Sequence, residues 1–136
     1  MKTFTVHTKG HYDFIDITEQ AASAIAASGI VEGVATIFVA HSTTALTAME
    51  YEPGIIADLN ALFEKWAPEA GDYAHHSKWG DRNGAAHMKS SIVGPDLTVP
   101  VSDSALALGS WQRIVLIDFD EKPRTRTVHV AVCPSS

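Results

Sequence analysis

The eight residues from Gly33 to Ala40, GVATIFVA, constrain the fold more than any other segment of this chain. They are apolar or β-branched, and the run is too short and too rich in β-branched residues for a helix. We therefore predict a buried central β-strand at this place.

Further β-rich segments follow the same logic along the chain. The clearest is the alternating run RTRTVHVAV at 124–132, which predicts the last strand. The segment 41–50 continues extended after a bend, and Gly94-Pro95-Asp96 predicts a turn. The other predicted strands lie at 3–8, 14–17, 89–93, 97–101 and 111–119.

Two segments predict helices. The first starts near Asp16 or Thr18, either of which can cap it, and stops at Gly29. The second starts at Pro53, carries apolar residues at helical spacing, and ends before Pro68. The order of these elements predicts an α+β fold, an antiparallel sheet or sandwich with two main helices.

Length and charge limit what this chain can be. Its 136 residues fit a single domain over 1–136. Acidic residues outnumber basic ones by 16 to 10, which argues against nucleic acid as the main partner. No segment has the apolar length of a membrane span or of a signal peptide, so we expect a cytoplasmic protein with no membrane association.

Histidines at predicted strand–loop junctions are the first candidates for chemistry. His41 follows the central strand, and His75 and His87 lie in a long loop predicted at 67–87. Imidazole is a common ligand for zinc, and three protein ligands with a water make an open catalytic site. The spacing alone is weak support for a metal, because histidines bonded to loop backbone would look the same.

Charged residues near these histidines have two interpretations each. Glu50 is a candidate general base, or it complements the dipole of the second helix. On the strand predicted at 89–93, Lys89 would share a face with His87 and favour a phosphate or carboxylate ligand. Arg124 and Arg126 alternate onto one strand face, which suits a phosphate but is equally typical of a solvated surface.

Taken together, several short motifs resemble the YjbQ-like family, the secondary thiamine-phosphate synthase family, from about residue 2 to residue 132. "AH-x-KSS" and "LG-x-WQ … PR-x-R" are the most specific. In chain order the motifs are His41-Ser-Thr-Thr-Ala-Leu-Thr; Glu50, Pro53 and Asp58; Tyr73-Ala-His75; Asp81-Arg-Asn83-Gly-Ala-Ala-His87-Met-Lys-Ser-Ser; Gly94 and Val99-Pro100-Val101; Leu108-Gly109-Ser110-Trp111-Gln112; and Pro123-Arg124-Thr-Arg126.

The resemblance implies an α+β homotrimer with a histidine-centred pocket, a divalent metal (zinc first among the candidates) and a phosphorylated small-molecule substrate. It implies a thiamine-phosphate synthase activity that is secondary, the principal role being unsettled. As metal ligands it implies His41, His75 and His87. The remaining site candidates are Glu50, Lys89, Trp111 and Gln112 for catalysis, and Thr43, Ser90, Ser91, Arg124 and Arg126 for substrate binding.

The chain departs from the family pattern at five positions. Met49 and Tyr51 stand where many relatives have asparagine, Asp96 where a small hydroxyl residue is common, and Ser104 and Lys122 where glycines are usual. A carboxylate at Asp96 would repel a phosphate if it pointed into the pocket.

Three functions fit these residues. In the synthase hypothesis, cationic groups stabilise a departing diphosphate, and Trp111 or Tyr73 stacks on a ring. In a hydrolase hypothesis, a histidine-bound metal and Glu50 activate water on a small phosphate ester or amide. The third is a non-catalytic protein that binds a metal or metabolite.

Overall fold

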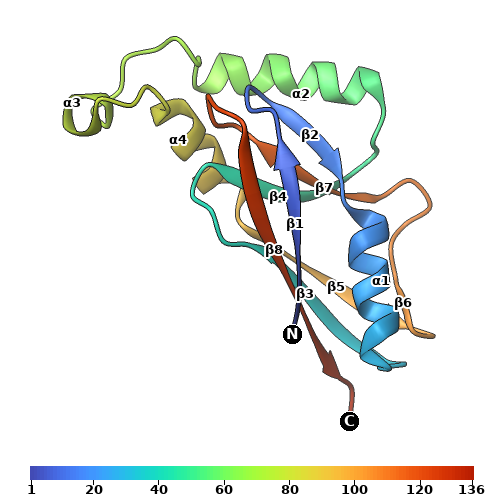
Figure 1. Ribbon diagram of the computed structural model, residues 1–136. Helices are drawn as coiled ribbons and strands as arrows, with labels where there is room; N and C mark the ends of the chain where they lie inside the picture. Colours follow the sequence, from blue (N-terminus) through green and yellow to red (C-terminus); the bar gives the residue numbers. More distant parts are fainter.

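The computed structural model describes residues 1–77 and 80–136 in full, and the backbone at 78–79. Strands and helices combine in an α+β fold, as predicted (Figure 1). The strands are β1 (Lys2–Thr8), β2 (Asp13–Asp16), β3 (Gly33–Val39), β4 (Thr44–Met49), β5 (Asp96–Ser102), β6 (Ala105–Leu106), β7 (Arg113–Asp118) and β8 (Arg124–Pro134). The helices are α1 (Thr18–Ser28), α2 (Pro53–Trp66), the single turn α3 (His76–Trp79) and α4 (Gly84–Val93).

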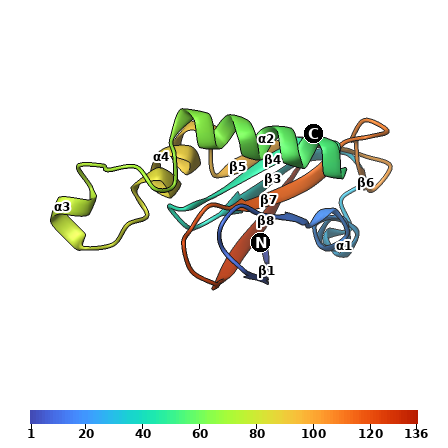
Figure 2. The ribbon, with the colours of Figure 1, turned by 90° about the horizontal axis from the view of Figure 1, so that it is seen from above.

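The strands form two antiparallel sheets. The larger sheet has the order β1-β8-β3-β5-β6, and the smaller sheet has the order β2-β7-β4. The helix α2 runs along the smaller sheet, with α1 at one end of the molecule and α3 and α4 at the other (Figure 2). The chain between α2 and α4 therefore lies at the α4 end.

The smaller sheet is buried on both faces. One hydrophobic cluster fills the space between the two sheets and α1, and includes Leu46 and Leu116. A second cluster lies between the smaller sheet and α2 and α4, and includes Ala45 and Phe63. Burial on both faces explains why β7 reads as a continuous apolar run rather than as an alternating strand.

The prediction of a buried central strand at 33–40 is confirmed only in part by β3. It does lie inside the larger sheet, between β8 and β5. Its burial alternates, however, and the outward side chains of Val34 and Phe38 are 43% and 40% exposed. The strand is therefore buried on one face only, and the outer face of the larger sheet stays open.

The prediction of a strand at 89–93 is wrong, because residues 84–93 form the helix α4. Alanine, methionine and lysine, which favour helices, dominate its first half. The predicted loop at 67–87 is correspondingly shorter, since it contains α3 and the start of α4. The two-residue strand β6 was also missed.

Local signals place the ends of the helices. Glu52 caps α2 by accepting hydrogen bonds from the backbone N–H groups of Gly54 (2.8 Å) and Ile55 (2.5 Å). Asp16 Oδ1 accepts a bond from Thr18 N–H (3.0 Å) at the start of α1. Within the described chain, no helix is both long and apolar enough to cross a membrane.

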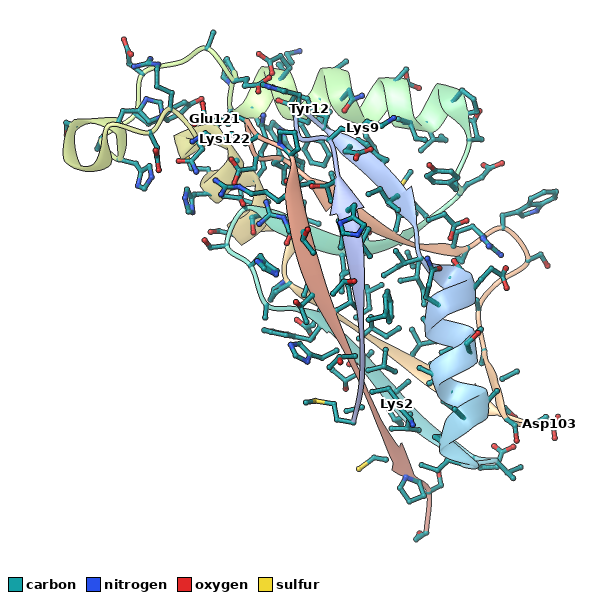
Figure 3. The ribbon with its side chains drawn as sticks, viewed as in Figure 1. Lys2, Lys9, Tyr12, Asp103, Glu121 and Lys122 are labelled. Carbon is teal, nitrogen blue, oxygen red and sulfur yellow. The ribbon has the colours of Figure 1, made fainter. Side chains whose placement is uncertain are left out.

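The two ends of the molecule carry different turns. Tyr12 and the turn at Glu121 and Lys122 lie at the end that carries α3 and α4, whereas Asp103 lies at the far end beyond α1 (Figure 3). The neighbour of Asp103, Ser104, has φ 62°, in the left-handed region that favours glycine. A glycine at this position would adopt the same conformation without strain.

Candidate functional site

Two imidazole rings meet at the α4 end of the molecule. His75 immediately precedes α3 and His87 lies in the first turns of α4, and their ring centroids are 4.6 Å apart. His75 Nε2 donates a hydrogen bond to Asn83 Oδ1 (3.1 Å), and the His87 ring bonds to the backbone of Ser42. We call His75 and His87 the histidine pair.

The environment of the pair keeps a lone pair available on His87. Burial lowers the pKa of His87 below its ordinary value, and the neighbouring His75 lowers it further, against the opposing effect of Asp120. The ring is therefore neutral at neutral pH. One nitrogen is held by an oxygen acceptor and the other has no hydrogen-bond partner among the described residues, which is the pattern of metal-binding histidines.

His41 is held differently. Its Nε2 accepts a hydrogen bond from the backbone N–H of Thr127 (3.0 Å), so the proton of the neutral ring lies on Nδ1. Burial, and then the charge of Arg126, lower the pKa of His41. His41 offers no free lone pair in this arrangement, and its role as a metal ligand stays a prediction.

The described residues of one chain gather no group of three or more histidine, cysteine, aspartate or glutamate side chains suited to a metal ion. The histidine pair supplies two imidazoles. Any further ligand would be water or a group outside this arrangement.

Next to the histidines lies a buried network of charged and hydroxyl groups, which we call the Arg126 network. Arg126 donates to both oxygens of Asp118, through Nε (2.7 Å) and Nη2 (2.9 Å). Nη2 also donates to Thr43 Oγ1 (2.8 Å), and Thr43 in turn donates to Asp120 (2.9 Å). The network connects the end of β7 with β8 and with the loop before β4.

Asp118 is the centre of this network, and its acceptor capacity is filled. Besides the two bonds from Arg126, it accepts a bond from Thr8 Oγ1 (2.5 Å) and one from the backbone N–H of Asp120 (2.9 Å). Burying a charge is tolerable only with such partners. The carboxylate and the guanidinium therefore stabilise each other.

Arg124 and Arg126 do lie on one side of β8, as predicted. They do not form a pair that is free to bind a phosphate, however. Arg126 is buried and committed to the network, so the alternative of a solvated strand face fails for it as well. Arg124 keeps a half-exposed guanidinium, with Nε 3.4 Å from Asp120. Positive charge accessible to a phosphate therefore belongs to Arg124.

The expectation that Lys89 shares a face with His87 is wrong. Residues two apart on a helix point to nearly opposite sides. Lys89 is only 1% exposed, packs over the ring of Tyr12 (4.1 Å to the centroid) and lies 4.0 Å from Glu64. The ammonium group of Lys89 therefore binds partners inside the protein and does not reach a ligand at the histidine pair.

The two predicted serines have ordinary structural bonds. Ser90 is buried and donates to the carbonyl oxygen of Thr44 (2.5 Å), which ties α4 to β4. Ser91 is exposed and donates to the carbonyl oxygen of His87 within the helix (2.8 Å). Their part in substrate binding stays a prediction.

Glu50 and Trp111 lie in a separate groove at the other end of the smaller sheet. Glu50 follows β4, whereas Ser42, which contacts His87, precedes it. Six residues of strand separate the two, or about 20 Å at roughly 3.3 Å per residue. Within one chain, Glu50 is therefore too far away to act on a ligand of the histidine pair.

Three of the departures from the family pattern have clear places. Asp96 is exposed in β5, paired with Phe38, and points to the outer face of the larger sheet rather than to the histidines. Met49 is buried in the second hydrophobic cluster. Tyr51 donates to the carbonyl oxygen of Phe14 (2.8 Å) and lines the groove with Glu50.

Sequence reasoning missed Asp118 and Asp120. The signal was present, since two carboxylates end an apolar run that must be buried, and two arginines follow within eight residues. Buried carboxylates require cationic partners, so these four residues form a natural set.

Comparison with known proteins gives a consistent result. The family model described as "UPF0047 protein YjbQ-like" matches residues 2–135. A UPF0047 protein of Archaeoglobus fulgidus is 37% identical over 93% of this chain and 95% of its own length. The UPF0047 protein YugU of Bacillus subtilis is 35% identical over 96% of each chain.

Solved structures agree with the sequence relatives. An uncharacterised YjbQ/UPF0047 protein of Clostridium acetobutylicum has a TM-score of 0.89 and 31% identity, covering 98% of this chain and 100% of its own. A protein of unknown function from Sulfolobus solfataricus, described as YbjQ-like, also has a TM-score of 0.89, with 28% identity over 98% and 97% of the two chains. The fold is shared throughout.

Replacing Asp118 tests the Arg126 network. We expect Asp118→Ala to lower the free energy of unfolding by about 3–5 kcal/mol, because it leaves a buried guanidinium without its main partner. The exposed Asp58→Ala should change stability by no more than about 0.5 kcal/mol. Urea unfolding measures both, and an Asp118→Leu/Arg126→Met double variant should recover most of the loss. A small effect of Asp118→Ala would contradict the buried pairing.

The free energy of unfolding should depend on the protonation of the two half-buried histidines, His41 and His87. The folded-state pKa values of His41 and His87 lie below the ordinary value of 6.5, so the unfolded chain binds more protons. Stability should be full above about pH 6.5 and fall as the pH drops through the folded pKa values. Urea midpoints of metal-depleted protein at a series of pH values measure this. His87→Gln should make the urea midpoint less dependent on pH, whereas His7→Gln, at an exposed histidine, should leave the dependence unchanged. The same pH dependence in the wild type and both variants would contradict this prediction.

Proposed function

Because this chain belongs to the YjbQ-like family (UPF0047), we propose that it is a small homotrimeric protein that binds a divalent metal and makes thiamine phosphate as a secondary activity. The observation that carries the proposal is the histidine pair, with one nitrogen of each ring held by an oxygen acceptor. Zinc is the metal best suited to imidazole in this setting.

The residues fit a metal in part. His75 and His87 would hold it, with Asn83 and the backbone of Ser42 orienting the rings. When bound, the metal supplies positive charge that stabilises phosphate oxygens. His41 would join these ligands only if it gave up its bond to Thr127.

In the proposed reaction, the thiazole nitrogen attacks the methylene carbon of a pyrimidine diphosphate, a carbon–nitrogen bond forms, and diphosphate leaves with the bonding electrons. The protein must align the two rings and stabilise the leaving group. Of the two arginines on β8, Arg124 is the one whose guanidinium reaches solvent. Arg126 and Asp118 keep the neighbouring loops in place.

The positions of Glu50 and the histidine pair argue against the hydrolase hypothesis. It assigned Glu50 as the base, and Glu50 lines a different groove from the histidine pair. A single chain therefore offers no such pairing. The synthase hypothesis loses Trp111 from the site for the same reason, but it keeps Tyr73 as a stacking ring and does not depend on Glu50 as a base.

The open face of the larger sheet supports the proposed trimer. Among its outward side chains Asp96 carries the one formal charge, although a sheet face that meets water is normally rich in charged residues. An uncharged face that also exposes apolar side chains such as Val34 and Phe38 suits contact with another copy of the chain. Its outward residues are Thr3, Thr5, His7, Val34, Thr36, Phe38, Asp96, Thr98, Pro100, Thr125, Thr127, His129, Ala131 and Cys133.

Metal binding tests the first half of the proposal. Calorimetric titration with zinc should give about one ion per chain in the wild type and none in His87→Ala. Asn83→Ala should weaken zinc binding by about 10–100-fold, because Asn83 orients His75. His7→Ala is the matched control and should bind zinc normally. Wild-type protein that binds no zinc, while remaining folded by circular dichroism, would overturn the metal site.

Product formation tests the second half. We expect zinc-loaded protein to form thiamine phosphate slowly from the pyrimidine diphosphate and the thiazole phosphate, and His87→Ala or a chelator to abolish the product. Arg124→Gln should lower the rate by about 10-fold or more, since it removes the exposed charge beside the site. The hypothesis fails if His87→Ala keeps the wild-type rate. Turnover of simple phosphomonoesters by the wild type would favour the hydrolase instead.

A further inference from the structure

The groove at the far end of the smaller sheet combines exposed aromatic rings with carboxylates. It has a volume of about 380 Å³. Trp111 is 75% exposed and Tyr51 is 41% exposed, although large aromatic side chains are normally covered. We call this site the aromatic groove; it is lined by Asp16, Glu50, Tyr51, Glu52, Ser110, Trp111 and Arg113.

The turn that carries Trp111 and the ring of Tyr51 are both held by hydrogen bonds. Trp111 sits in a turn that is closed twice, since Gln112 N–H donates to the Gly109 carbonyl oxygen (3.0 Å) and Gln112 Oε1 accepts from Gly109 N–H (2.8 Å). Tyr51 is anchored through its hydroxyl to Phe14. A turn and a ring that are fixed in advance lose little entropy when a ligand binds. Gln112 is accordingly a positioning residue for Trp111.

The charges of the groove are mostly committed, with one exception. Asp16 accepts from Arg113 Nε (2.7 Å), and Arg113 Nη2 donates to Glu19 (3.0 Å). Glu52 is occupied in capping α2. Within the described chain the carboxylate of Glu50 makes no hydrogen bond or ion pair, so it is available to a ligand.

The overall balance of the groove excludes an anion. Three carboxylates face one guanidinium, and the Nε and Nη2 groups of that guanidinium already bind carboxylates. A phosphate would meet net negative charge here, whereas a cation would be attracted. The chemistry is thus the reverse of that expected beside the histidine pair.

We propose that the aromatic groove binds a small organic cation, a quaternary or aromatic ammonium group without phosphate, between the indole of Trp111 and the carboxylate of Glu50. Tryptophan gives the strongest attraction of an aromatic ring for such a cation. A methylated ammonium group also buries its apolar surface against both rings. The site involves neither the metal nor the histidines, so its test is separate from the test of the metal site.

Titration with choline tests this site, with its uncharged isostere 3,3-dimethylbutan-1-ol as the reference ligand. The readout is the indole N–H resonance of Trp111 in nitrogen-15 NMR spectra of the whole chain, identified by its loss in Trp111→Leu. We expect choline to shift this resonance saturably, and the isostere to bind roughly fivefold more weakly or worse. Glu50→Gln should weaken choline binding by roughly threefold or more.

Matched variants complete the experiment. Trp66→Leu removes another exposed tryptophan, and Asp58→Asn removes another exposed carboxylate; both should leave choline binding unchanged. His87→Ala should also bind choline normally, which separates this site from the proposed metal site. Equal binding of choline and the isostere, or no effect of Glu50→Gln, would overturn the proposal. It would equally fall if Trp111→Leu changed the molecular mass in solution and choline did not bind, because a second copy would then cover the groove.

Discussion

The buried ion pair between Arg126 and Asp118 is the interaction on which the rest of this structure depends. Arg126 belongs to the larger sheet and Asp118 to the smaller one, so the pair ties the two layers together at one end. Neither group tolerates burial alone. The position of β8 over β7 is therefore fixed by the ion pair at this end and by apolar packing between the sheets along the rest of the strands.

The ion pair between Arg126 and Asp118 also holds the segments that contact His87 and His41. Thr43, which accepts from Arg126, adjoins Ser42, and Ser42 bonds to His87. On the other side of Arg126, Thr127 donates its backbone N–H to His41. Loops that carry imidazoles are thus attached to the most strongly bonded part of the interior. A rigid base of this kind is what a site on loops requires.

Local sequence was enough to predict β3 from an apolar run, β8 from its alternation, α1 from its capping residues and α2 from apolar residues at helical spacing. It failed for α4, whose buried positions are Ala85, Ala86, Lys89 and Ser90, small or polar residues that leave no apolar stripe in the sequence. It also failed to show that β3 keeps an open face. That property depends on what packs against the strand, which local sequence does not contain.

Some residues of the candidate site could likewise be predicted from the sequence, and others could not. The long loop and the family motifs pointed to His75 and His87, which the structure brings together, but Asp118 and Asp120 appear only when distant strands are paired. Pairing also removes charge that the sequence seemed to offer, since Lys89 and Arg126 are both spent on internal partners. Arg124 alone, already close to Asp120, is a weak site for a diphosphate. A metal at the histidine pair would add the positive charge that a diphosphate requires at this end, so the metal hypothesis supports the synthase hypothesis.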